Sequence, residues 1–88
     1  MIWTVEFQEQ AIEDLEQLDK AVQKRILRYF AERIEHSSDP RQFGKALTGG
    51  KKGLWRYRIG DYRAICAVED HRLIVLVLAV GHRRKIYQ

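Results

Sequence analysis

The fold is decided by one stretch of the sequence, residues 54–68, which reads LWRYRIGDYRAICAV. Residues that favour strands alternate on both sides of Gly60-Asp61, a pair typical of a two-residue hairpin turn. The stretch therefore predicts two antiparallel strands, over residues 54–59 and 62–68. With this turn, Arg58 lies directly opposite Arg63.

Because side chains alternate between the two faces of a strand, Arg56, Arg58 and Arg63 share one face of the predicted hairpin. Two arginines placed opposite each other cost a few tenths to about 1 kcal/mol. No glutamate on this face offsets them. Guanidinium groups are fixed, permanently charged forks of donors, which phosphate groups match well. The pattern favours a phosphate site; the alternative is a basic edge that keeps exposed strands from aggregating.

Working outward towards the C-terminus, residues 72–80 are apolar on both faces and predict a third strand, central in the sheet and covered on each side. This strand runs antiparallel to the second and therefore ends beside Gly60-Asp61. It brings Arg83 and Arg84 towards the hairpin arginines, with Tyr87 close behind.

Towards the N-terminus, residues 2–7 alternate as a strand, and from about Gln8 the period becomes helical. The expected buried stripe of the first helix is Ala11, Ile12, Leu15 and Leu18. Asp19 then begins a second helix as its N-cap, with the stripe Val22, Ile26, Leu27, Phe30 and Ile34. The second helix is expected to end near residue 36, and a basic, exposed loop follows as far as Gly53.

The expected fold is therefore α+β, in the order β-α-α-β-β-β, with a helical hairpin packed on a small, largely antiparallel four-stranded sheet. Residues 1–88 form a single domain, since 88 residues leave room for one core. One cysteine excludes an intrachain disulfide and a thiolate metal cluster. The start shows no secretion signal and the longest apolar run is too short for a bilayer, which predicts a cytoplasmic protein without membrane contact.

The charge is unevenly distributed along the chain. Residues 1–35 carry a net charge of −3 and residues 36–88 a net charge of +7. Such asymmetry favours a polyanionic partner for the second half. The alternative is that the lysines and arginines serve solubility.

Two motifs, residues 53–65 (GLWRYRIGDYRAI) and 80–87 (VGHRRKIY), resemble the RelE/ParE toxin superfamily, and most closely its RelE branch. The resemblance covers nearly the whole chain. It implies a RelE-like toxin of a type II toxin–antitoxin system: a ribosome-dependent endoribonuclease (an mRNA interferase) that cleaves translated mRNA in the ribosomal A site and arrests growth. It also implies the ribosome, mRNA and a cognate RelB-like antitoxin as partners, with a toxin–antitoxin heterotetramer as one arrangement.

The resemblance assigns roles to particular residues. Arg56 and Arg58 occupy the two basic positions of the catalytic strand, Arg63 follows the hairpin, Arg83 follows the last strand, and Tyr87 is the C-terminal aromatic residue. The best-known member has lysines in place of Arg56 and Arg58. Arginine does not give up its proton, so at these two positions we expect charge stabilisation and no base.

The expected reaction needs neither a metal nor another cofactor, because RNA carries its own nucleophile in the 2′-hydroxyl. Tyr87 is a candidate for orienting that hydroxyl or accepting its proton, and His82 is a second acid–base candidate. The candidates for RNA contact are Lys45, Lys51, Lys52, Arg84 and His82, together with Arg41. The basic residues Lys24, Arg25, Arg28 and Arg33 of the second helix either extend this surface or form a solvated helix face.

Two other functions stay open at this point. The ParE branch shares the fold and inhibits DNA gyrase, but it tends to lack the arginine and tyrosine found here at Arg83 and Tyr87. A catalytically inactive, RNA-binding relative is the other alternative, because arginines replace the two lysines. The combination of Arg83 and Tyr87 favours the nuclease.

Overall fold

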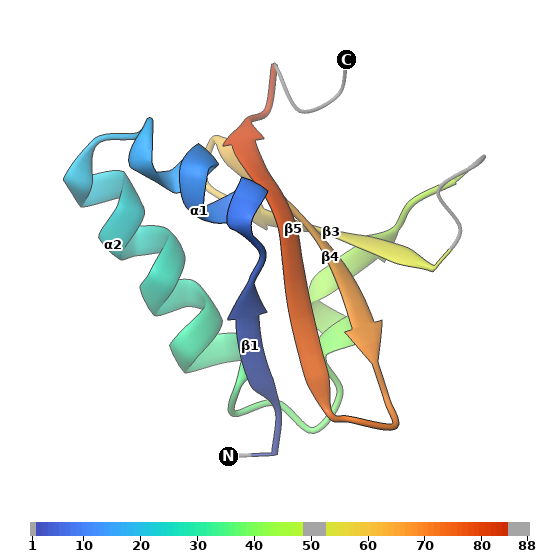
Figure 1. Ribbon diagram of the computed structural model, residues 1–88. Coiled ribbons are helices and arrows are strands. Elements are labelled where there is room, and N and C mark those ends of the chain that lie inside the picture. The colour runs from blue at the N-terminus through green and yellow to red at the C-terminus, as the bar shows by residue number, and fades with distance from the viewer. Residues whose placement is uncertain (1, 49–52, 85–88) are drawn as a thin grey trace.

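The computed structural model describes residues 2–48 and 53–84, and in that part of the chain five strands form one sheet. The strands are β1 (Thr4–Phe7), β2 (Gly44–Ala46), β3 (Leu54–Ile59), β4 (Tyr62–Glu69) and β5 (Ile74–His82). Their order in the sheet is β1-β5-β4-β3-β2; β1 is parallel to β5, and the other neighbours are antiparallel. Helices α1 (Glu9–Glu16) and α2 (Lys20–Tyr29) pack on one side of this sheet (Figure 1).

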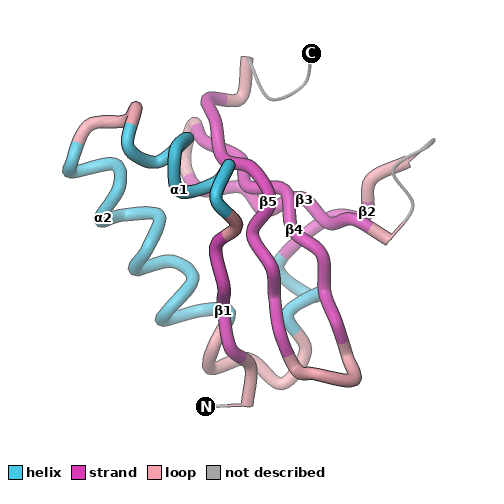
Figure 2. The backbone as a smooth tube through the Cα atoms, in the orientation of Figure 1, coloured by secondary structure: helices cyan, strands magenta, loops and turns pink. Residues whose placement is uncertain are grey.

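The predicted α+β class and the helical hairpin are confirmed, but within the described residues the sheet has five strands where four were expected. The additional strand, β2, lies in the segment predicted as a loop, after a short 3-10 helix, η2 (Pro40–Phe43). Its three residues, Gly-Lys-Ala, carry no strand-forming pattern. They are held by pairing with β3, in the register Gly44↔Tyr57. The path of the chain, including this edge strand, can be followed in Figure 2.

The core lies between the helices and the sheet. Ala11 and Leu15 of α1 and Ile26 of α2 are buried against it. The second helix continues as a π-helix, η1 (Phe30–Ile34), in which the Glu35 N–H donates to the Phe30 carbonyl at 3.0 Å.

Two residues of the predicted stripes are not buried. Ile12 is 46% exposed and Leu27 is 45% exposed. Each follows a buried residue by one position, which is about 100° around a helix, and the contact faces of these helices are too narrow to include them. Asp19 is the N-cap of α2 as predicted, although its side chain makes no capping hydrogen bond.

Strand β5 lies inside the sheet, between β1 and β4, as predicted. Its coverage differs from the prediction: Val75 and Val77 are fully buried on the helix-facing side, whereas Leu76, on the other side, is half-buried. An apolar residue on the second face of a strand therefore does not by itself indicate a second covering layer. None of the helices in residues 2–48 and 53–84 is long and apolar enough to span a membrane.

The end of β5 is held by helix α1. Pairing between β1 and β5 stops at Phe7↔Val77, and β5 bulges against β4 just beyond this point. The Asp14 carboxylate then accepts a hydrogen bond from the Val80 N–H at 2.9 Å, in place of a strand partner. This contact adds to the pairing with β4 in holding the last residues of β5, which lead to Arg83.

Candidate phosphate-binding site

The hairpin has the predicted register. Ile59 pairs with Tyr62 and Arg58 with Arg63, across a turn in which Gly60 has a φ of +62°. Such a φ strains residues with a side chain, and glycine adopts it without that cost. Tyr57 and Ala64, on the helix-facing side, are fully buried, so the arginines lie on the opposite face.

This face holds a cavity of about 320 Å³, which we call the hairpin cavity. It is lined by Gln42, Phe43, Gly44, Lys45, Arg56, Arg58 and Arg63. The structure thus brings together three of the predicted catalytic residues and one predicted RNA-binding residue, Lys45. Among the residues that the structure describes, the lining has four cations and no carboxylate, which is the composition of a site for a polyanion.

Arg63 is the most buried of these cations, with 8% of its surface exposed. Its Nη1 donates to the backbone carbonyls of Gly60 and Tyr62, each at 3.0 Å. In the described part of the chain the ion pairs involve Arg41 and Arg72, and none involves Arg63. A buried charge without a counter-ion is costly. The two carbonyls fix the direction of this guanidinium, and an anion in the cavity would neutralise it.

The C-terminal end of β5 reaches the same end of the sheet, as predicted. The Arg83 N–H donates to the Asp61 carbonyl at 2.8 Å. Because Gly81 pairs with Arg63, strand alternation assigns position 83 to the arginine side. Arg83 and Arg84 are exposed.

His82 lies on the other side of the sheet. It pairs with Tyr62, and the two rings are in edge-to-face contact with centroids 5.5 Å apart. Its Nδ1 accepts the Arg84 N–H at 3.2 Å. Tyr62 packs against the core, so the His82 ring is directed away from the hairpin cavity. Three further candidates, Lys51, Lys52 and Tyr87, lie outside the described residues.

Arg41, a further candidate for RNA contact, does not line this cavity, although its neighbour Gln42 does. Its Nη1 donates to the Asp70 carboxylate at 3.0 Å, in a bidentate pair, and its guanidinium lies 5.9 Å from the Trp55 ring centre. The hydrogen bond from Arg41 lowers the pKa of Asp70. Arg41 therefore connects η2 to the β4–β5 turn and is neutralised there.

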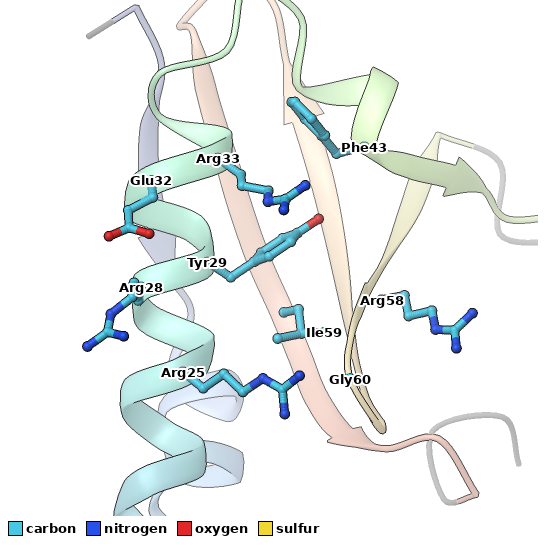
Figure 3. Close-up of a pocket in the computed structure, with 9 residues that line it drawn as sticks. All are labelled: Arg25, Arg28, Tyr29, Glu32, Arg33, Phe43, Arg58, Ile59 and Gly60. Carbon is cyan, nitrogen blue, oxygen red and sulfur yellow. The ribbon is translucent and has the colours of Figure 1, made fainter.

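A second cavity, of about 480 Å³, lies between α2 and the end of β3, and we call it the helix groove (Figure 3). It involves Arg25, Tyr29 and Arg33 of the second helix, and it shares Phe43 and Arg58 with the hairpin cavity. The sequence left open whether the helix arginines form a site or a solvated face. Tyr29 and Phe43 were not predicted as site residues. The spacing of residues 25, 29 and 33, which places them on one helix face, is the signal that could have identified this groove.

Other reactive groups do not form a site in the part of the chain that the structure describes. Residues 2–48 and 53–84 contain no group of three or more His, Cys, Asp or Glu residues that could hold a metal ion. Cys66 is fully buried, and burial raises the pKa of its thiol, so it is a packing residue.

Comparisons with known proteins agree with this fold. A family model described as "ParE toxin of type II toxin-antitoxin system, parDE" matches residues 5–87. The chain is 30% identical over 87 residues to a RelE-like toxin protein of Escherichia coli, which covers 97% of this chain and 87% of that protein. It is also 30% identical over 88 residues to toxin RelG of Mycobacterium tuberculosis, across 100% of this chain and 99% of that protein.

A solved structure shows the same architecture. A chain of the toxin–antitoxin complex RelBE2 from Mycobacterium tuberculosis superposes with a TM-score of 0.84 at 28% identity, over 94% of this chain and 100% of that one. The chain therefore belongs to the ParE toxin family of type II toxin–antitoxin systems, within the RelE/ParE superfamily that its motifs indicated. Within that superfamily it is a toxin of the RelBE type.

Proposed function

We propose that this toxin is a metal-independent endoribonuclease that cleaves mRNA in the A site of the translating ribosome. The observation that carries the proposal is the hairpin cavity, where Arg63 is 8% exposed and has no carboxylate partner in residues 2–48 and 53–84. Arg56, Arg58 and Lys45 line the same cavity. A single phosphodiester in this space would be surrounded by positive charge.

The chemistry that fits such a cavity is attack by the RNA on its own backbone. The 2′-oxygen forms a bond to the adjacent phosphorus as the bond from phosphorus to the 5′-oxygen breaks. The products are a 2′,3′-cyclic phosphate and a free 5′-hydroxyl, with the proton lost from the 2′-hydroxyl and another gained by the 5′-oxygen. Negative charge develops on the phosphate in the transition state, and oriented guanidinium groups stabilise it.

Each residue has a distinct role in this scheme. Arg63, fixed by the carbonyls of Gly60 and Tyr62, holds the phosphate with Arg83. Arg58 stabilises the transition-state charge, with a smaller contribution from Arg56. Arginine cannot accept a proton, so the base must be another group. We assign that role to Tyr87 in preference to His82, because the His82 ring lies on the Tyr62 side of the sheet.

The partners in this proposal are a RelB-like antitoxin, the ribosome and mRNA. The similar RelBE2 structure is a complex with an antitoxin, which supports an equivalent partner here. An antitoxin segment with carboxylates would neutralise the cavity arginines. Lys45 and Arg84, with Lys51, Lys52 and the Arg83 end of β5, would contact the RNA backbone around the active site.

Gyrase inhibition is the second candidate function, because the matching family model is described as a ParE toxin. Such a toxin acts by binding and leaves RNA intact. The two functions therefore differ in whether new RNA ends appear.

The test is primer extension on a translated mRNA after brief expression of the wild-type protein, Arg63→Met, Arg83→Ala and Arg72→Met. Arg72→Met is the matched control, since Arg72 lies at the other end of the sheet and pairs with Glu69 at 3.1 Å. We expect wild type and Arg72→Met to create 5′ ends in register with the reading frame. Arg63→Met should reduce them about 100-fold or more, because the phosphate loses its buried cation.

Two results would contradict the proposal, the first its nuclease activity and the second its dependence on the ribosome. Growth arrest by wild type without new 5′ ends, together with loss of supercoiling by purified gyrase, would support the ParE-like function. Ends that persist when translation is blocked would remove the dependence on the ribosome.

A further inference from the structure

The helix groove and the hairpin cavity are adjacent. Arg58 and Phe43 line both, so they form the boundary between the two spaces. β2 pairs with β3 only as far as Tyr57, which leaves the outer edge of β3 beyond that residue without a strand partner from β2. A flexible chain bound in the hairpin cavity can therefore continue past Arg58 into the groove.

The groove presents positive charge on one side of the helix. Figure 3 shows Arg25, Tyr29 and Arg33 directed from the second helix towards β3, whereas Arg28 and Glu32 are directed away. Glu32 is the carboxylate in the lining, so the groove interior faces cations. None of the ion pairs in the described part of the chain involves Arg25 or Arg33.

Two contacts hold these arginines in place. The Arg33 guanidinium lies 6.0 Å from the Tyr29 ring centre, a cation–π distance. The Arg25 guanidinium packs on Gly60: a Cβ added there would lie 2.7 Å from its Nη2. The absence of a side chain at Gly60 thus leaves the space that Arg25 occupies at the hairpin turn.

Aromatic rings lie between the cations. Phe43 is 36% exposed at the boundary of the two cavities, and Tyr29 is half-buried inside the groove. A single-stranded RNA alternates phosphates with bases, and bases stack on aromatic rings and guanidinium planes. A run of carboxylates alone would leave the rings uncovered, whereas the bases of an RNA strand would cover them.

We propose that the helix groove is a second phosphate subsite, in which Arg25 and Arg33 bind the RNA backbone one or more nucleotides away from the phosphate in the hairpin cavity, with a base against Phe43. The inference rests on the proposed function for the identity of the strand as RNA. It assigns Arg25 and Arg33 to substrate binding and leaves the reacting phosphate with Arg63.

The probe is a fluorescent 12-nucleotide RNA with 2′-O-methyl groups, which lacks the nucleophile, compared with a trinucleotide of the same chemistry. Fluorescence anisotropy at several salt concentrations gives the affinity of each protein variant. The test variant is Arg25→Glu/Arg33→Glu. The matched control is Lys20→Glu/Lys24→Glu, which makes the same charge change on exposed positions of α2 outside the groove.

We expect the test variant to bind the 12-mer at least tenfold more weakly than the control, with little change for the trinucleotide. The plot of log affinity against log salt has a negative slope, and its magnitude should decrease by about 1.4. Each phosphate contact on a single strand contributes about 0.7, and the variant loses two such contacts. Thermal unfolding verifies that both variants fold. If the glutamate variant unfolds, Arg25→Gln/Arg33→Gln removes the charges with less perturbation and should show a loss in the same direction.

Three results would overturn the subsite. Equal losses in test and control variants would mean that only net charge matters, and equal losses for both RNA lengths would place the effect in the hairpin cavity. No measurable binding of the 12-mer, with binding of a glutamate-rich peptide that depends on Arg25 and Arg33, would assign the groove to an acidic protein partner. Failure of the nuclease is distinguishable: wild type would then bind the 12-mer with this length dependence and create no new ends in translated mRNA.

Discussion

The two ends of the sheet use arginine in opposite electrostatic settings. At the β4–β5 turn, Arg41 is paired with Asp70 and Arg72 with Glu69. At the β3–β4 turn, Arg58 faces Arg63 across the hairpin, and Arg63 is oriented by two backbone carbonyls without a carboxylate in the described part of the chain.

The difference teaches how a binding arginine can be told from a structural one. A paired arginine has its charge neutralised within the fold, and its guanidinium donors are already used. An arginine held by carbonyls keeps its full charge and a fixed direction, at a cost in stability that an incoming anion relieves. An arginine without a carboxylate partner therefore indicates an anion-binding site more clearly than the number of basic residues does.

The largest effect is expected when the β3–β4 end of the sheet, which holds the proposed site, receives a carboxylate. Arg58→Glu converts an opposed arginine pair into an ion pair with Arg63. We expect cleavage to fall about 100-fold or more, since the cavity loses one cation and neutralises another. The free energy of unfolding should rise by about 0.5–1 kcal/mol, because a favourable cross-strand pair replaces a repulsive one.

Primer extension measures the first effect and urea unfolding the second. Arg58→Met is the control, because it removes the repulsion without adding an ion pair, and its gain in stability should be smaller. A loss of stability in Arg58→Glu would show that the opposed arginines do not repel each other in the folded protein.

A second variant separates backbone strain from the position of Arg25. Gly60→Ala places a residue with a Cβ at φ +62° and pushes that atom against the Arg25 guanidinium, so we expect a cost of about 1–2 kcal/mol. Gly53→Ala also places a Cβ at a positive φ, +88°, but there it would meet no atom of the described residues within 4 Å. Urea unfolding of both variants should show the larger loss for Gly60→Ala. Equal losses would mean that Arg25 moves away freely and that Gly60 does not position it.

The smallest expected effect on stability is at the β4–β5 turn, where Arg41 is paired with Asp70. Arg41 lowers the pKa of Asp70, so this carboxylate stabilises the fold above its usual pKa of about 4 and the contribution is lost as the pH falls through the lowered value. We therefore expect the difference in Tm between wild type and Asp70→Asn to be full at pH 7 and to shrink below about pH 4. In an Arg41→Met background the Asp70→Asn change should have no further effect. A difference in Tm that increases as the pH falls would contradict the pairing of Asp70 with Arg41.

The hairpin could be predicted from sequence because its signals are local. Gly60-Asp61 fixes the turn, and once the turn is fixed, alternation determines that Arg58 faces Arg63. The convergence of Arg83 on the same end followed from one topological step, the antiparallel return of β5. These predictions needed no knowledge of how the helices are oriented.

The parts that could not be predicted depend on packing between distant segments. β2 is three residues long and exists through its pairing with β3, so the sequence of that segment alone reads as a loop. The width of each helix contact face determined that Ile12 and Leu27 are exposed. The helix groove forms where α2 crosses the end of β3. Helical spacing predicts that Arg25 and Arg33 share one face of the helix, but it does not predict which segment lies opposite that face.

The bond between Asp14 and the Val80 amide links the first helix to the last strand over 66 positions of sequence. Past Val77 the strand has no neighbour in β1, so on that side it is held by a side chain of α1, while β4 pairs with it on the other side. We therefore expect that a substitution at Asp14 shifts the last residues of β5, and with them Arg83, without altering any residue of the cavity. A search for variants with altered activity should therefore include the first helix, although it lies outside the cavity.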